Sequence, residues 1–98
     1  MVVKTLPDIA GDNAAHQLTA SLIYAKWVQF TAAGGTGSPR VGDANVSASR
    51  GLAVPSAVAS TSPPVDFPIV SDPLDNYALN SLYAYVPTGT TLTITYGA

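Results

Sequence analysis

The chain has 98 residues, 47% of them hydrophobic and only 10% charged, with a formal net charge of −2. This length predicts a single domain, residues 1–98, with a modest two-layer core. The weakly acidic balance offers no basic stripe for phosphates, and the absence of cysteine removes disulfides, thiolate zinc sites and a cysteine nucleophile. The sequence has neither a run of the ~20 apolar residues that span a bilayer nor a signal peptide. We therefore expect a protein made in the cytoplasm that binds neither nucleic acid nor membrane.

The composition favours strands over helices. The chain lacks glutamate, is rich in valine, serine and threonine, and contains eight glycines and eight prolines. Surface helices normally carry glutamate and lysine, whereas β-branched residues and turn formers favour short strands. An all-β fold is the expectation.

The N-terminal third begins with residues 1–12, which read as an extended arm or edge strand because Pro7 interrupts the apolar run. Residues 14–20 could form one helical turn. The strongest strand signal follows at residues 22–31, where alternation places Val28 and Phe30 on one face. Trp27 and Gln29 fall on the other face, and Lys26 breaks the pattern, so a bulge or strand end is expected there.

The middle of the chain is rich in glycine and proline. A glycine-rich loop at residues 33–39 precedes an extended segment centred on Val41, and residues 51–55 read as another strand. Residues 65–70 form an irregular strand signal, which the neighbouring prolines restrict to an edge or a loop. Residues 71–77 are predicted to form a turn or a short helical turn.

The C-terminal segment, residues 81–97, predicts a hairpin. Leu82, Ala84 and Val86 alternate with Tyr83 and Tyr85, "PTGT" supplies a turn, and "TLTITY" alternates threonines with apolar residues. About seven or eight short strands separated by such turns predict an antiparallel β-sandwich or jelly roll.

No constellation indicates catalysis. His16 is the only histidine, and no serine lies in a "GxSxG" elbow, so a hydrolase built on His16 ranks far below a surface or packing role for that residue. All six aspartates lie in turn-like contexts, where capping explains them. We expect no enzyme, no cofactor and no metal.

Aromatic and arginine side chains are the candidates for a partner interface. Trp27, Tyr24, Tyr83 and Tyr85 belong to a set too large for one side of a small sandwich to bury. Aromatic residues and arginine are favoured in the buried centres of interfaces. The alternative is that Trp27 packs in the core with Phe30 and that the tyrosines cover sheet edges.

A longer pattern carries a resemblance. The succession "KWVQFTA", "RVGDANVSASRGLAVP", "FPI" and "YALNSLYAYVPTGTTLTITYG" resembles small virion proteins of tailed bacteriophages. It covers about Lys26 to Gly97, with an insertion-like departure at residues 56–66. Such proteins look like jelly-roll or β-sandwich modules of the head decoration or cement type.

The resemblance implies a place on the capsid exterior, with the major capsid protein as partner and self-association into a homodimer or homotrimer. The small residues of "GDANVSASRG" would let a loop lie close against a partner, Gly42 and Gly51 would adopt positive φ, and Arg40 and Arg50 would clamp carboxylates. The alternative is a receptor- or carbohydrate-binding module of a head fibre or tail-associated protein, in which Trp27 or a tyrosine stacks on a sugar ring.

Overall fold

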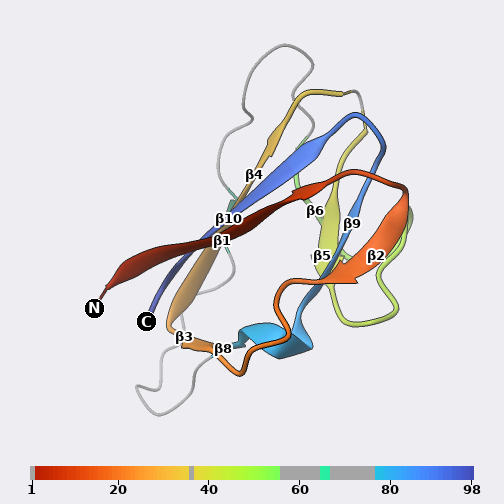
Figure 1. The fold of residues 1–98 in the computed structure, drawn as a ribbon. Helices are drawn as coiled ribbons and strands as arrows, with labels where there is room; N and C mark the ends of the chain where they lie inside the picture. Colours follow the sequence, from red (N-terminus) through yellow and green to blue (C-terminus); the bar gives the residue numbers. More distant parts are fainter. Residues whose placement is uncertain (1, 36, 56–64, 67–76) are drawn as a thin grey trace.

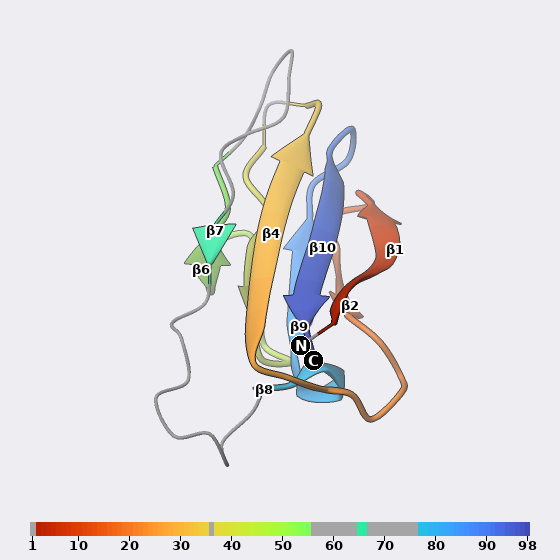
Figure 2. The same cartoon turned by 90° about the vertical axis from the view of Figure 1, so that its left-hand side faces the viewer.

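The computed structural model is a β-sandwich, and it describes residues 2–35, 37–55, 65–66 and 77–98. Sheet one has the strand order β1-β10-β4-β7, sheet two has the order β2-β9-β5-β6, and β3 and β8 form a small third sheet. Figures 1 and 2 show the two larger sheets packed face to face. The strands are β1 (Val3–Ala10), β2 (Ala14–Gln17), β3 (Tyr24–Ala25), β4 (Trp27–Ala33), β5 (Arg40–Gly42), β6 (Leu52–Ala53), β7 (Val65–Asp66), β8 (Tyr77–Ala78), β9 (Tyr83–Val86) and β10 (Thr91–Gly97), and a 3-10 turn, η1, covers Leu79–Ser81.

The strand pairing follows one rule, in which the first strand pairs with the last and so on inward. The antiparallel pairs are β1 with β10, β2 with β9, β3 with β8, β4 with β7 and β5 with β6. The chain is therefore one long hairpin whose tip is the loop between β5 and β6. Two further pairings, β4 with β10 and β5 with β9, roll this hairpin into two sheets. This is the jelly-roll arrangement, as the sequence predicted.

Strict alternation along the long strands builds the core. In β4 every second residue is buried, and Val28, Phe30 and Ala32 are all 0% exposed. Leu92 and Ile94 of β10 face the same interior, opposite Ala84 and Val86 of β9. The predicted faces of residues 27–31 are confirmed, and β3 and β4 are separated at Lys26, where a strand end was expected.

The predicted C-terminal hairpin is wrong. β9 and β10 lie in different sheets, and residues 87–90 carry the chain across the sandwich. The alternation of both segments is as expected, because each buries its apolar side in the common core. Alternation identifies the buried face of a strand and leaves its hydrogen-bonding partner open. Here the short turn, closed by Thr90 N donating to Pro87 O at 3.1 Å, joins two layers instead of two neighbours.

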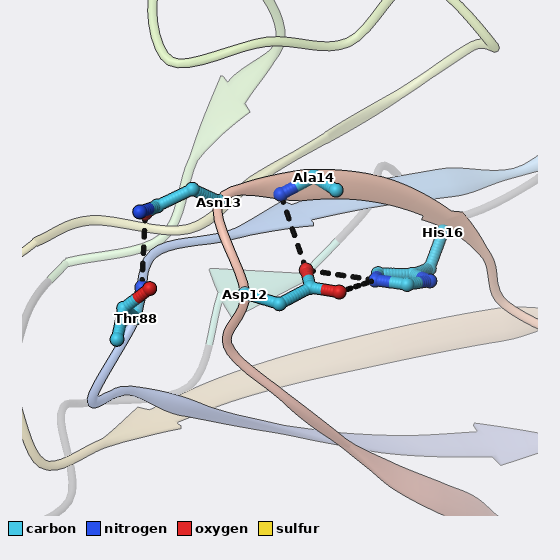
Figure 3. A network of polar contacts seen from close by, with 5 residues as sticks. All are labelled: Asp12, Asn13, Ala14, His16 and Thr88. Atoms are coloured by element: carbon cyan, nitrogen blue, oxygen red, sulfur yellow. Dashed lines mark hydrogen bonds and ion pairs between the residues drawn. The ribbon is translucent and has the colours of Figure 1, made fainter.

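A second crossing, between β1 and β2, lies directly against this turn. Gly11 N donates to Thr90 O at 2.8 Å, and Asp12 N and Asn13 N both donate to Val86 O. The two crossings are so close that a Cβ on Gly11 would lie 1.7 Å from Pro87 O. Asn13 has a φ of 60°, and its Oδ1 accepts a hydrogen bond from Thr88 N at 3.0 Å (Figure 3). Backbone contacts therefore fix the position of sheet one relative to sheet two at this corner.

The N-terminal segment is an edge strand and not a free arm. β1 pairs with β10 of the same chain, Leu6 is buried, and Val2 N and Ala98 O form a hydrogen bond of 3.0 Å. The register shifts between Leu6 and Ile9, around Pro7. A bulge and a proline at an edge discourage pairing with another sheet.

Two other expectations need correction. Residues 14–17 form strand β2 and not a helical turn, because their backbone pairs with β9. Gly42 is the last residue of β5 and has no positive φ, whereas Gly51 has the expected positive φ of 125°. The edge position predicted for residues 65–70 is confirmed for β7, while the prolines around it and the turn at residues 71–76 lie outside the described residues.

Candidate interaction surface on sheet two

The outer face of sheet two brings three of the predicted interface residues together. Tyr83 and Tyr85 alternate with the buried Ala84 and Val86 of β9, so their side chains point away from the core. Arg40 is directly opposite Tyr85 in the pairing of β5 with β9. On the other side of β9, Ala15 is opposite Tyr85 and Gln17 is opposite Tyr83. We call these five residues, Ala15, Gln17, Arg40, Tyr83 and Tyr85, the sheet-two surface.

The Arg40 side chain forms hydrogen bonds within its own chain instead of projecting into solvent. Its Nε donates to Ala48 O at 3.0 Å and its Nη1 donates to Gly51 O at 2.9 Å. Both acceptors belong to the loop between β5 and β6. A guanidinium presents several donors in a rigid plane and can therefore fix two carbonyls at once. Arg40 thus anchors the tip of the rolled hairpin beside the tyrosines.

The tip loop, residues 43–51, is compact and internally bonded. Asp43 Oδ1 accepts a hydrogen bond from Asn45 N at 2.9 Å, and Ser47 N donates to Arg50 O at 3.0 Å. Val46 is only 5% exposed and anchors the loop to the body of the protein. A Cβ on Gly51 would lie 2.8 Å from Val46 Cγ2. The small residues of this stretch therefore allow two successive tight turns, with the exposed Arg50 at their end.

The other two aromatic candidates lie elsewhere. Trp27 is half-buried and points away from the core on the outer face of sheet one, so it is neither a core residue nor a neighbour of Tyr83. Tyr24 is in β3 and is 56% exposed. The expected interface residues are thus divided over three sheets and the tip loop, and Arg40, Tyr83 and Tyr85 form a compact group on sheet two.

Sequence reasoning missed Ala15 and Gln17. Both belong to β2, which was predicted as a helical turn. Residues two apart do not share a face of a helix, so that prediction did not place Ala15 and Gln17 together beside the tyrosines. Gln17 also donates from Nε2 to Asn80 O at 2.6 Å, which ties the edge of sheet two to η1. Reading residues 14–17 as a strand would have placed Ala15 and Gln17 on one face by their spacing of two.

His16 takes part in a local contact at the crossing of the two sheets. Its Nε2 lies 2.8 Å from both carboxylate oxygens of Asp12, and the two side chains are 43% and 52% exposed (Figure 3). Asp12 Oδ1 also accepts a hydrogen bond from Ala14 N at 3.1 Å, which is the turn-capping role predicted for the aspartates. Asp43 plays the same role in the tip loop. Within the described ranges no three acidic or histidine side chains gather into a possible metal site.

Comparison of this chain with models of protein families, with curated proteins and with solved structures gives no match. Among the residues that the structure describes, no helix has the length and apolar character needed to cross a membrane. The class that the strand order defines is the all-β jelly-roll sandwich.

Proposed function

We propose that this chain is a structural protein of a tailed-bacteriophage virion, a decoration or cement protein that binds the outer surface of the assembled head. The observation that carries the proposal is where the phage-like sequence stretches lie in the fold. "RVG" forms β5, "GLAVP" includes β6 and the tyrosine strand is β9, and these three strands are neighbours in sheet two. The jelly roll alone would not support the proposal, because this architecture serves many functions.

The sheet-two surface has the chemistry of an interface centre. Tyr83 and Tyr85 offer large, rigid and partly apolar side chains, and such residues dominate binding energy in protein interfaces. The adjoining tip loop is held by Arg40 and Val46, so little conformational entropy remains to be lost when a partner covers it. Arg50, which is exposed on the loop, supplies a cation for a carboxylate of the partner.

The proposed action is mechanical. Each subunit would contact the major capsid protein through the sheet-two surface and the tip loop, and a homodimer or homotrimer would bridge adjacent capsomers. Many weak symmetric contacts add through multivalency and resist the pressure of the packaged genome. No step requires a cofactor.

The first test is the copy number of this chain in purified virions, measured by quantitative mass spectrometry against the major capsid protein. A simple fraction of the capsid protein is expected for a decoration lattice. A few copies per particle would assign the chain to a fibre or tail, and absence from virions would refute the structural role.

A variant test then examines the surface itself. Tyr83→Ala with Tyr85→Ala should lower capsid binding by at least tenfold in a cosedimentation assay, because two central aromatic contacts are lost. Tyr24→Ala is the matched control, since it removes an exposed tyrosine from a different sheet. Equal loss in both variants would show that the sheet-two surface has no special part in binding.

A further inference from the structure

The outer edges of the two larger sheets differ in how they are protected. Sheet one ends at β1 and β7, and sheet two ends at β2 and β6. An open edge offers unpaired backbone groups to another chain, and natural proteins block such edges with prolines, bulges, lysines or very short strands. β1 has a register shift around Pro7 and carries Lys4, and β6 and β7 have two residues each. These three edges therefore carry features that discourage pairing with another chain.

β2 is the edge without such protection. Its four residues, Ala14–Gln17, include no proline, lysine or arginine, and they pair with β9 without a register shift. Figure 1 shows β2 at the rim of the sandwich, and in the part of the chain that the structure describes no strand pairs with its outer side. β2 therefore presents an open edge beside the tyrosines of β9.

The hydrogen bonds of β2 show which backbone groups face this edge. Leu18 N donates to Leu82 O at 3.0 Å, so these two residues form a hydrogen-bonded pair of the antiparallel ladder. Hydrogen-bonded and non-bonded pairs alternate along such a ladder. Counting back from Leu18, the N–H and C=O groups of Ala15 and Gln17 point away from β9. Both residues are exposed, and their backbone groups are placed to bond a further strand.

We propose that this edge binds the same edge of a second copy, so that two four-stranded sheets join into one of eight strands. We call this contact the β2 seam. In an antiparallel arrangement with a two-fold axis at His16, Ala15 is opposite Gln17 of the partner subunit, and Gln17 is opposite the partner's Ala15. Each of these pairs exchanges two backbone hydrogen bonds, so every free group that Ala15 and Gln17 offer is used. The arrangement closes after two subunits, as symmetric dimers do.

The side chains of this edge also fit a second copy. On the outer face of the joined sheet a small alanine lies opposite a neutral glutamine, so no like charges are opposed there. On the axis His16 faces its counterpart, and each imidazole has both carboxylate oxygens of its own Asp12 at 2.8 Å. Neither imidazole therefore faces the other without a carboxylate beside it. The edge is complementary to itself in hydrogen bonding and in charge.

This inference deepens the proposed function, and its meaning at the capsid rests on that function. The β2 seam would place two sheet-two surfaces side by side on one continuous outer face, so that a dimer presents Tyr83 and Tyr85 of both subunits to the capsid. Two short strands make a smaller contact than most stable dimers have, so we expect a dissociation constant in the micromolar range. Multivalent binding to the capsid would then strengthen the dimer.

The sharpest test places a cysteine on the proposed axis. The chain has no cysteine, so His16→Cys introduces a single thiol. Opposed residues of a non-bonded antiparallel pair have Cα atoms ~4.5 Å apart, within the ~4.4–6.8 Å range of disulfides. His16→Cys should form an intermolecular disulfide in a glutathione buffer at least tenfold faster than Lys4→Cys, measured on non-reducing gels. Lys4 is the matched control because it also belongs to a hydrogen-bonded pair of its ladder, on the protected edge β1.

Association without a cross-link is measured by sedimentation equilibrium and light scattering. The parent chain should shift from 10.0 kDa toward twice that mass as its concentration rises through the micromolar range. Ala15→Pro should raise the dissociation constant of the dimer at least tenfold, because it removes an N–H that the β2 seam uses and β9 does not. Thr5→Pro is the matched control, since its N–H faces the open side of β1, and it should leave association unchanged.

A second variant covers the case in which Ala15→Pro fails to fold, as circular dichroism would show. Ala15→Lys places a charge on the exposed outer side of the edge and should weaken the dimer to a similar extent. Thr5→Lys on β1 is its control.

Four results would overturn the β2 seam. The parent chain stays monomeric up to millimolar concentration, or it forms a trimer, or His16→Cys cross-links no faster than Lys4→Cys, or the folded variants at Ala15 associate as tightly as the parent chain. These measurements use the isolated chain and need no capsid. A dimer with the expected variant effects in a chain that is absent from virions would refute the proposed function and leave the β2 seam intact.

Discussion

Gly11→Ala should be among the most destabilising single-methyl additions to this protein. The new Cβ would lie 1.7 Å from Pro87 O, 2.5 Å from Pro87 C and 2.8 Å from Thr90 O, all of which are backbone atoms. No side chain can rotate away, so the two crossings between the sheets must separate. Separation strains or breaks the hydrogen bonds that Gly11 N, Asp12 N and Asn13 N make across the corner.

The expected cost follows from those contacts. Three backbone hydrogen bonds at roughly 0.5–1.5 kcal/mol each, with the strain of overpacking, give a loss of about 3 kcal/mol or more in the free energy of unfolding. Urea denaturation followed by circular dichroism measures it from the shift of the midpoint. Gly89→Ala is the control, because its Cβ would meet nothing closer than 4.0 Å and would suffer only from its φ of 89°. That strain costs about 1–2 kcal/mol. If Gly11→Ala cost no more than Gly89→Ala, the close packing of the two crossings would be refuted.

Three further substitutions test separate parts of the fold. Phe30→Ala should lower the free energy of unfolding by about 3–5 kcal/mol in urea denaturation, because it leaves a cavity at a fully buried site. A loss below about 1 kcal/mol would contradict that burial. Arg40→Met should lower the free energy of unfolding by about 1–2 kcal/mol and speed hydrogen exchange of amides in residues 43–51, because two hydrogen bonds to the tip loop are lost. Unchanged exchange would show that Arg40 does not hold the tip loop. The Asn13→Ala variant should be less stable than the Asn13→Gly variant, because both lose the hydrogen bond to Thr88 N but only alanine is strained at a φ of 60°. The reverse order of stability in thermal unfolding would contradict this strain.

The fold class and the buried faces were predictable from the sequence because they depend on local periodicity. In β4 and β10 a residue's neighbours two positions away decide which side it buries, and this pattern can be read along the chain. The choice of partner strand was not predictable in the same way. β10 pairs with β1, about ninety residues earlier, and a turn as short as residues 87–90 is compatible with either a hairpin or a crossing.

The candidate surface was predictable in its residue types and not in its grouping. Tyr83 and Tyr85 were predicted as aromatic side chains that the core could not hold, and Arg40 was predicted from the resemblance to phage virion proteins. Their adjacency depends on the pairing of β5 with β9, which joins segments more than forty residues apart. Trp27 was predicted as an interface residue because it is aromatic, like the two tyrosines, but it lies on the outer face of the other sheet. The type of a side chain does not show which sheet its strand joins.

The low charge of the chain is also found on the outer faces of the two larger sheets. A sheet face that meets only water usually carries charged side chains, which keep a protein soluble. Across the paired outward positions of β1, β10 and β4 there is no charge, and Asp66 of β7 is opposite Gln29 at the edge of the same sheet. On the sheet-two surface Arg40 directs two of its donors into the tip loop. The one charged side chain of the sheet-two surface is thus engaged within its own chain, and low charge is typical of the buried centre of an interface. Cover of the sheet-two surface by a partner, as proposed above, would account for the low charge of that face.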